Sequence, residues 1–172
     1  MKASRLQAAL GLHRAARPAP SASERARLML VACSESIASA GLLTAFPSAY
    51  VLQTLAHGPE ALDAASRATV VYGVLESGVR HVVVCGHGGC GGDDGAPTPE
   101  VSQARVVARC RAMQADQQLG PVLRRAHVSM QALWLDDASG DVYQCDFEGR
   151  PARRLEDQHL AALFNRLDDL SA

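Results

Sequence analysis

The chain has 172 residues, 48% of them hydrophobic and 20% charged, and its formal net charge is −1. This length and composition predict a soluble globular protein with a sizeable core. The small net charge argues against a broad surface for nucleic acid or acidic lipid, and the apolar runs are too short to span a membrane.

The N-terminal region, residues 1–24, is predicted to be a helical arm and linker in front of a single domain over residues 25–172. No acidic residue precedes Glu24, which is typical of transit peptides, so organellar import is not excluded. The spacing of Leu6 and Leu10 favours an amphipathic helix instead. Five cysteines, an odd number in a chain of this length, favour a reduced, cytoplasmic setting over a disulfide-linked secreted domain.

The body of the chain alternates strand-like with helix-like segments. Apolar or alternating runs predict strands at 27–33, 50–54, 80–86, 127–135 and 142–147. Helical patterns occur at 61–77, 98–118 and 156–170. The Gly120-Pro121 pair is expected to end the second of these helices. In the first, one face is expected to carry Leu62, Ala65, Thr69, Tyr72 and Leu75.

This order of segments predicts an α/β fold. Strands that alternate with helices form a mainly parallel central sheet flanked by those helices. The turn DDASGD at 136–141 joins the last two strands as an antiparallel hairpin, which places the hairpin at an edge of the sheet. In parallel sheets, ligands bind beyond the carboxyl ends of the strands, so residues there are the candidates for a site.

The glycine-rich stretch GHGGCG at 86–91 follows one of the two most apolar strands. It matches the nucleotide-binding pattern G-x-G-x-x-G, but two aspartates and a proline follow where a helix would have to open. No G-K-[ST] is present, which excludes a P-loop. A nucleotide-binding domain is therefore the weakest of three interpretations.

The second interpretation is a metal site. His87 and Cys90 have H-x-x-C spacing, and Cys33 stands at the end of the other strong strand as a third ligand. One imidazole and two thiolates suit Zn²⁺ and leave a fourth position open, as catalytic zinc requires. In the third interpretation the cysteines are simply buried, which is what we expect of Cys85, Cys110 and Cys145. For Cys33, His87 and Cys90, the residues alone leave both interpretations open.

Three stretches resemble the β-class carbonic anhydrase family: LMLVACSES, ASRATVVYGVLESGVRHVVVCGHGGCGG and ALWLDDASGDVY. The resemblance covers about residues 25–147. It implies a mainly parallel sheet flanked by helices, with Cys33, His87 and Cys90 as ligands of Zn²⁺. It also implies reversible hydration of carbon dioxide to bicarbonate, and a homodimer or multiple of dimers in which the N-terminal helix reaches the neighbouring subunit.

The sequence departs from the family pattern C-x-D-x-R, which here reads CSESI. Glu35 occupies the aspartate position and Ile37 the arginine position. In the family, the aspartate orients the attacking water and the arginine holds the aspartate away from the metal. Without that cation, Glu35 either closes the site as a fourth ligand or acts as the catalytic residue that orients the water and accepts its proton.

A second departure lies in YVLQTLAHG, where the family has an Arg-Asn-x-Gly-Asn-like stretch. Gln53 stands near the arginine position, and His57 is either an ordinary loop histidine or a proton shuttle. These departures leave two functions open. One is a zinc enzyme that hydrates carbon dioxide, at a full or a reduced rate, or hydrolyses carbonyl sulfide or carbon disulfide. The other is a catalytically inactive zinc protein with a structural, binding or regulatory role.

Overall fold

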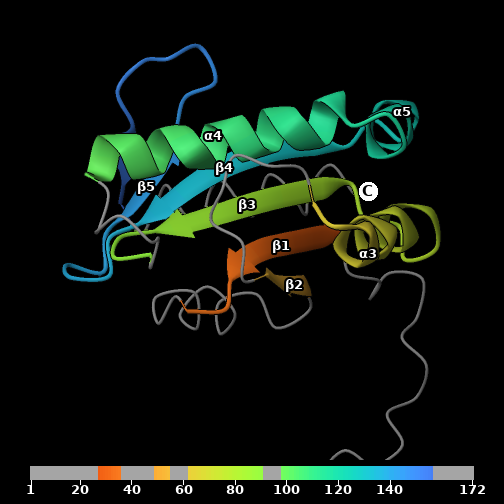
Figure 1. The fold of residues 1–172 in the computed structure, drawn as a ribbon, viewed down its shortest axis with the longest axis horizontal. Helices are drawn as coiled ribbons and strands as arrows, with labels where there is room; N and C mark the ends of the chain where they lie inside the picture. Colours follow the sequence, from red (N-terminus) through yellow and green to blue (C-terminus); the bar gives the residue numbers. More distant parts are fainter. Residues whose placement is uncertain (1–26, 36–48, 55–61, 91–97, 157–172) are drawn as a thin grey trace, which may run out of the picture.

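Six strands form one mixed sheet in the order β2-β1-β3-β4-β5-β6 (Figure 1). The structure is a computed structural model that describes residues 27–35, 49–54, 62–90 and 98–156. The strands are β1 Leu28–Cys33, β2 Tyr50–Thr54, β3 His81–His87, β4 Ser129–Leu135, β5 Val142–Cys145 and β6 Arg153–Leu155. The helices described are α3 Ala64–Leu75, α4 Pro99–Ala115 and α5 Leu119–Arg125.

Strands β2, β1, β3 and β4 are parallel to one another, whereas β5 and β6 are antiparallel to their neighbours. The predicted α/β fold, with a mainly parallel sheet and an antiparallel edge hairpin, is therefore confirmed. The β1 and β3 segments are almost wholly buried. Strands covered on both faces need apolar side chains at successive positions, which explains their unbroken apolar sequences.

The two faces of the sheet carry separate hydrophobic clusters. On one face, α3, α4 and α5 pack against alternate residues of the central strands, with α4 lying along β3 and β4 (Figure 1). The other face buries Leu30, Ala32, Val83, Cys85, Leu133, Leu135 and Leu155. This period-two division follows from the alternating direction of side chains along a strand.

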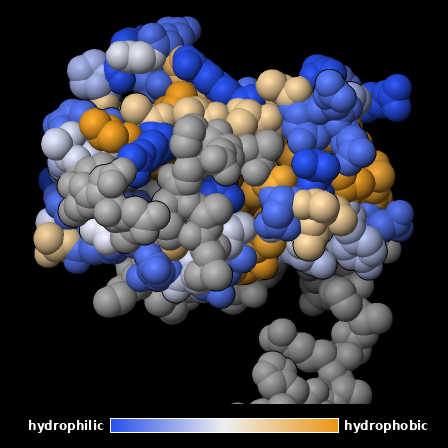
Figure 2. Space-filling view, in the orientation of Figure 1, coloured by the Kyte–Doolittle hydropathy of each residue, from blue (hydrophilic) through white to orange (hydrophobic). Residues whose placement is uncertain are grey.

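The buried face of α3 differs from the predicted one. Tyr72 and Leu75 are 56% and 61% exposed, while Val70, Gly73 and Val74 face the sheet. A Cβ on Gly73 would lie 2.5 Å from the terminal methyl group of Met29, so Gly73 faces the sheet at close range. Figure 2 shows hydrophobic residues on the surface at the side where α3 lies, within a largely hydrophilic outline. Apolar residues occur on several sides of this helix, and periodicity therefore did not identify the packed side.

The segment after α4 also differs from the prediction, because Gly120-Pro121 belong to a helix instead of ending one. Helix α4 ends at Ala115, and Asp116 Oδ1 accepts backbone hydrogen bonds from Gln118 and Leu119 at 2.9 and 2.8 Å. Pro121 falls in the first turn of α5, where a missing N–H leaves no helical hydrogen bond unmade. Strand β6 was not predicted; it has only three residues.

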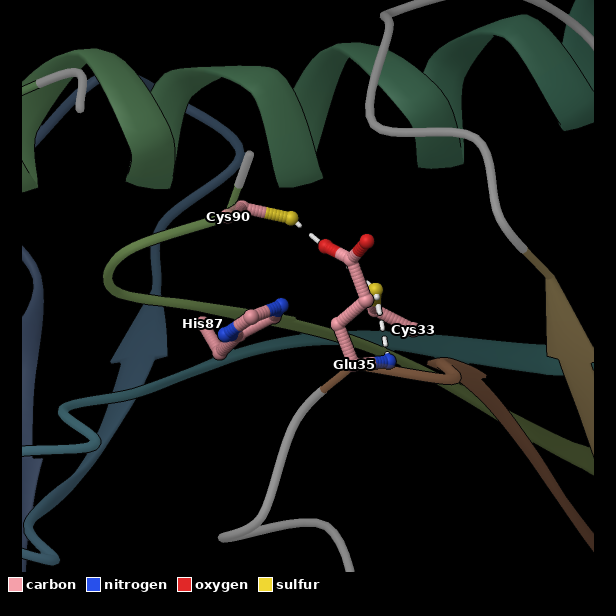
Figure 3. A group of neighbouring side chains, drawn as sticks. All are labelled: Cys33, Glu35, His87 and Cys90. Carbon is pink, nitrogen blue, oxygen red and sulfur yellow. Dashed lines mark hydrogen bonds between the residues drawn. The ribbon is translucent and has the colours of Figure 1, made fainter. Parts of the chain in front are cut away.

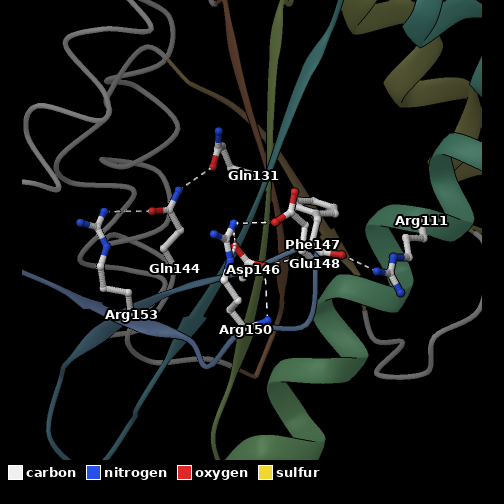
Figure 4. Close-up of polar contacts among 8 residues, drawn as sticks. All are labelled: Arg111, Gln131, Gln144, Asp146, Phe147, Glu148, Arg150 and Arg153. Carbon is white, nitrogen blue, oxygen red and sulfur yellow. Dashed lines mark hydrogen bonds and ion pairs between the residues drawn. The ribbon is translucent and has the colours of Figure 1, made fainter.

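Short polar contacts hold the β5–β6 edge of the sheet (Figure 4). Gln144 donates to Gln131 at 2.9 Å and accepts from Arg153 at 3.2 Å, so the contacts span β4, β5 and β6. In the following turn Arg150 forms an ion pair with Asp146 at 2.9 Å. Charged side chains on a short outer strand discourage pairing with another chain.

The N-terminal arm, the boundary at residue 25 and residues 157–170 of the predicted C-terminal helix lie outside the described residues. Among the helices that the structure describes, none has the length and apolarity needed to cross a bilayer.

Gly86 allows β3 and α4 to pack closely. A Cβ at this position would lie 2.2 Å from Cγ2 of Val106, a stiff β-branched side chain. We expect Gly86→Ala to lower the free energy of unfolding by about 1–3 kcal/mol through overpacking. Gly88→Ala is the matched control, because its nearest contact would be 3.5 Å. Urea denaturation of both variants measures the difference, and equal losses would contradict this account of Gly86.

Candidate metal centre

The predicted ligands meet at one edge of the sheet. Cys33 ends β1 and His87 ends β3, and these strands are parallel neighbours, so their carboxyl ends coincide. Cys90 follows three residues after His87, and Glu35 two residues after Cys33. One donor atom from each of these four residues lies within 4.8 Å of the other three (Figure 3). The structure thus brings together all four site residues that the sequence predicts.

The spacing of the sulfurs suits a tetrahedral metal shell. Cys33 Sγ and Cys90 Sγ are 3.9 Å apart, with the Cys90 thiol donating to Cys33. Two thiolates at about 2.3 Å from one Zn²⁺ would be roughly 3.8 Å apart in tetrahedral geometry. The backbone N–H of Glu35 donates to Cys33 Sγ at 3.3 Å, which supports negative charge on that sulfur.

The four side chains differ in their exposure. Cys33, His87 and Cys90 are buried, whereas Glu35 is exposed. Figure 3 shows the Glu35 carboxylate directed towards the Cys90 sulfur. The cluster therefore has a buried part of two sulfurs and one imidazole, and a carboxylate that also reaches solvent.

Asp137, in the turn between β4 and β5, orients the His87 ring. His87 Nδ1 donates to Asp137 Oδ2 at 2.6 Å, since an ionised carboxylate can only accept. This hydrogen bond selects the tautomer with the proton on Nδ1, in which Nε2 would be the nitrogen that binds a metal, an arrangement common behind histidine ligands. The sequence did not single out Asp137. Its position in the hairpin turn was predicted, but not its contact with a residue 50 positions earlier.

The loop that carries Cys90 is held between α4 and β4. Trp134 Nε1 donates to Ser102 Oγ at 2.9 Å, and Ser102 Oγ donates to the His87 carbonyl at 3.1 Å. Gly88 N–H donates to the Leu135 carbonyl at 2.9 Å. These bonds connect the end of β3 to its neighbours before the chain turns at Gly89, whose φ of +70° favours glycine.

Burial raises the pKa of the Cys90 thiol to about 12, and the neighbouring Cys33 adds to the shift. A divalent cation would be needed to hold the Cys90 sulfur as a thiolate at neutral pH. Burial also raises the pKa values of Cys85, Cys110 and Cys145 to about 12. These three lie in the hydrophobic clusters, as predicted, and none of the five cysteines forms a disulfide.

A small pocket of about 40 Å³ opens beside the cluster. Its apolar wall includes Val31, Val84 and Val106, and its polar side includes Thr54, Ser102, Arg105 and Arg109. Gln53 is of interest because it stands near the family's arginine position. Gln53 is exposed on β2 and does not line the pocket, whereas the adjacent Thr54 does. His57 and Ile37 lie outside the described residues.

The sequence matches the family model described as carbonic anhydrase over residues 28–141. The chain belongs to the β-carbonic anhydrase family. A search of curated protein sequences found no significant match. The family model spans β1 to the hairpin turn that precedes β5, so the four clustered residues all lie inside the matched region.

Solved β-carbonic anhydrases share this fold at low sequence identity. A tetrameric β-carbonic anhydrase of Sordaria macrospora has a TM-score of 0.59 at 17% identity, over 83% of this chain and 92% of that one. A carbonic anhydrase of Streptococcus mutans has a TM-score of 0.59 at 18% identity, over 83% and 94%. The β-carbonic anhydrase CafA of Aspergillus fumigatus has a TM-score of 0.57 at 18% identity, over 96% and 91%.

Proposed function

We propose that this chain binds one Zn²⁺ through Cys33, His87 and Cys90 and catalyses the reversible hydration of carbon dioxide to bicarbonate. The observation that carries the proposal is the convergence of the four donor atoms within 4.8 Å in a chain of this family. The donor set fits zinc, because its sulfurs are suitably spaced and Asp137 orients the imidazole. Zinc bound there would supply hydroxide at neutral pH by lowering the pKa of water.

The pocket suits a small, linear, apolar substrate. A volume of about 40 Å³ compares with roughly 10–15 Å³ for one water on the same kind of measure, so it admits a molecule of three or four heavy atoms. The valine wall offers carbon dioxide an apolar surface next to the ligand cluster. Glu35 is proposed as the catalytic residue: it lies in the cluster and is exposed, so it can accept a proton and release it to solvent.

For the assembly we propose a homodimer or a multiple of dimers. The similar β-carbonic anhydrase from Sordaria macrospora is tetrameric, which is compatible with this proposal. A reduced, cytoplasmic setting is proposed because five buried cysteines without a disulfide suit it. Sedimentation of the purified chain tests the assembly, and a monomer at micromolar concentration would refute it.

The function is tested by stopped-flow hydration of carbon dioxide, with zinc measured on the same samples. We expect one zinc per chain and activity clearly above that of Cys90→Ser. Zinc at one per chain without such activity would favour the second candidate, an inactive zinc protein. The observation that favours this candidate is the presence of the Glu35 carboxylate among the donor atoms, where it can fill the fourth position. Release of hydrogen sulfide from carbonyl sulfide or carbon disulfide by the same samples tests the related hydrolase activity.

The contribution of Asp137 to metal binding can be measured separately. We expect Asp137→Asn to weaken zinc binding by about 10- to 100-fold, because the amide no longer holds His87 in its metal-binding tautomer by a charged hydrogen bond. Competition with a chelating dye gives the dissociation constants. Asp141→Asn is the control, because this carboxylate in the same turn pairs with Arg154 at 2.7 Å, on the neighbouring strand. Equal zinc affinity in both variants would show that Asp137 does not contribute to metal binding.

A further inference from the structure

Trp134 packs against the end of β3 that carries His87. It is the chain's only tryptophan, is 3% exposed, and pairs with Gly86 in the register of β4 with β3. A Cβ on Gly86 would lie 3.7 Å from Cδ1 of the indole, and a Cβ on Gly88 would lie 3.5 Å from its Cζ2. The indole therefore lies alongside the residues on both sides of His87.

Ser102, on α4, connects this indole to the His87 backbone. Trp134 Nε1 donates to Ser102 Oγ at 2.9 Å, and Ser102 Oγ donates to the His87 carbonyl at 3.1 Å. An indole N–H can only donate and a carbonyl can only accept, so the single hydroxyl proton of Ser102 is directed to His87. Ser102 is 6% exposed, and buried polar groups of this kind are normally hydrogen-bonded. The two bonds form a relay from β4 through α4 to β3.

The peptide group between His87 and Gly88 is held at both ends. Its carbonyl accepts from Ser102, and its N–H donates to the Leu135 carbonyl at 2.9 Å. Because a peptide group is planar, two bonds from different elements, α4 and β4, fix the orientation of its plane. From this plane the chain reaches Cys90 through two glycines, which restrict the backbone little. The direction in which the loop leaves β3 is therefore set by the peptide group.

We propose that Ser102, with Trp134 as its hydrogen-bond donor, is a positioning residue of the metal centre. Its bond to the His87 carbonyl sets where the loop places Cys90 Sγ relative to the His87 ring. Asp137 orients that ring through Nδ1 at 2.6 Å, so the histidine is held once through its side chain and once through its backbone. The inference rests on the metal-binding part of the proposed function and is independent of the reaction that the metal supports.

The test replaces zinc by Co²⁺ in the full-length protein. The visible absorption of Co²⁺ depends on its coordination geometry, and competition with a chelating dye gives its dissociation constant. We expect Ser102→Ala to change the spectrum and to raise the dissociation constant by about tenfold or more, as is typical when a group that orients a ligand is lost. Ser102→Thr keeps the hydroxyl and should restore both quantities to near the wild type. Trp134→Phe should raise the dissociation constant about threefold, because the hydroxyl loses one of its two partners.

Ser66→Ala is the matched control. Ser66 is also a buried serine on a helix, 9% exposed, and its hydroxyl donates to Asp63 Oδ2 at 2.7 Å in the first turn of α3. It does not line the pocket beside the cluster. Its replacement should lower the stability of the fold, leave the Co²⁺ affinity within twofold of the wild type and leave the spectrum unchanged. A merely structural role of Ser102 would give this same pattern.

Circular dichroism and metal content accompany each measurement. Wild-type affinity and spectrum in a folded Ser102→Ala variant overturn the positioning role, and so does a folded Ser102→Thr variant that binds Co²⁺ no better than Ser102→Ala. If Ser102→Ala does not fold, Trp134→Phe decides, and unchanged affinity and spectrum there overturn the relay. Selective loss of Co²⁺ affinity in Ser102→Ala, in a protein without hydration activity, would support the positioning role and reject the proposed reaction. Hydration activity together with unchanged affinity in Ser102→Ala would do the reverse.

Discussion

Replacing Cys90 by serine is expected to reduce bound zinc from one per chain to a small fraction and to destabilise the fold. Cys90 Sγ is one of two sulfurs that lie 3.9 Å apart at the junction of β1 and the β3 loop. Structural zinc sites contribute about 10–16 kcal/mol in small peptides. An equal share among four ligands is about 3 kcal/mol, or roughly 10²-fold in zinc affinity. The metal would also join two strand ends, so its loss should lower the melting temperature.

Cys85→Ser is the control for this experiment. Cys85 is also buried and lies five residues earlier, on β3, but it belongs to the hydrophobic cluster on the other face of the sheet. Its replacement puts a hydroxyl into an apolar environment, so some stability should be lost while zinc stays at one per chain. Metal analysis by plasma mass spectrometry, together with thermal melting, separates the two effects. Full zinc occupancy in Cys90→Ser would refute the assignment of Cys90 as a ligand.

Glu35→Gln is expected to lower kcat/KM for carbon dioxide hydration by about 10²-fold while zinc remains bound. The amide keeps the size of the side chain but cannot accept a proton, and general-base catalysis is typically worth 10²–10⁴-fold. Cys33, His87 and Cys90 would still hold the metal, because Glu35 is the exposed member of the cluster. Stopped-flow assays give the rates, and metal analysis on the same samples gives the zinc content.

The same variant separates the two hypotheses for Glu35. If Glu35 closes the site as a fourth ligand, its replacement should open a position on the metal, raise the activity and weaken zinc binding. A rise in activity would show that the carboxylate blocks the reaction, and weaker zinc binding would show that it is a ligand. Glu148→Gln serves as the control, because this exposed carboxylate pairs with Arg150 in the turn after β5 and should leave both quantities unchanged.

Combining Glu35→Asp with Ile37→Arg restores the family pattern C-x-D-x-R and is expected to raise hydration activity above the wild type. The shorter carboxylate and the added cation would supply the pair that the resemblance identifies as missing. Stopped-flow rates of the double variant and of each single variant measure the gain. A double variant no faster than the wild type would mean that other residues of the pocket limit the rate.

Local sequence was informative for the central strands and for the loop that carries the cysteine. The LMLVAC and HVVVCGH segments are apolar at successive positions because parallel strands are buried on both faces, and this pattern does not depend on their neighbours. Cys33 and His87 stand at the carboxyl ends of these strands, and such ends meet at one edge of a parallel sheet, so a site at that edge could be predicted from the residues there. That β1 and β3 are direct neighbours could not be predicted, because β2 lies between them in the sequence but outside them in the sheet.

Contacts between distant elements could not be predicted in this way. The side of α3 that packs on the sheet carries Val70, Gly73 and Val74, whereas Tyr72 and Leu75 are exposed. The hydrogen bond from His87 to Asp137 joins residues 50 positions apart, and it exists only because the register of β3 with β4 places the hairpin turn beside the histidine. Neither contact leaves a signal in local composition.

The amino-acid sequence was thus sufficient for the fold class and the ligand candidates, since hydrophobic period and strand ends are local properties. The tertiary structure alone determines which side chains of α4 line the pocket. The pattern around position 37 predicted a site without its cation, yet α4 brings Arg109 into the pocket against Thr54. Which side chain a helix presents to a cavity is settled by packing across the whole sheet, and that packing exists only in the folded chain.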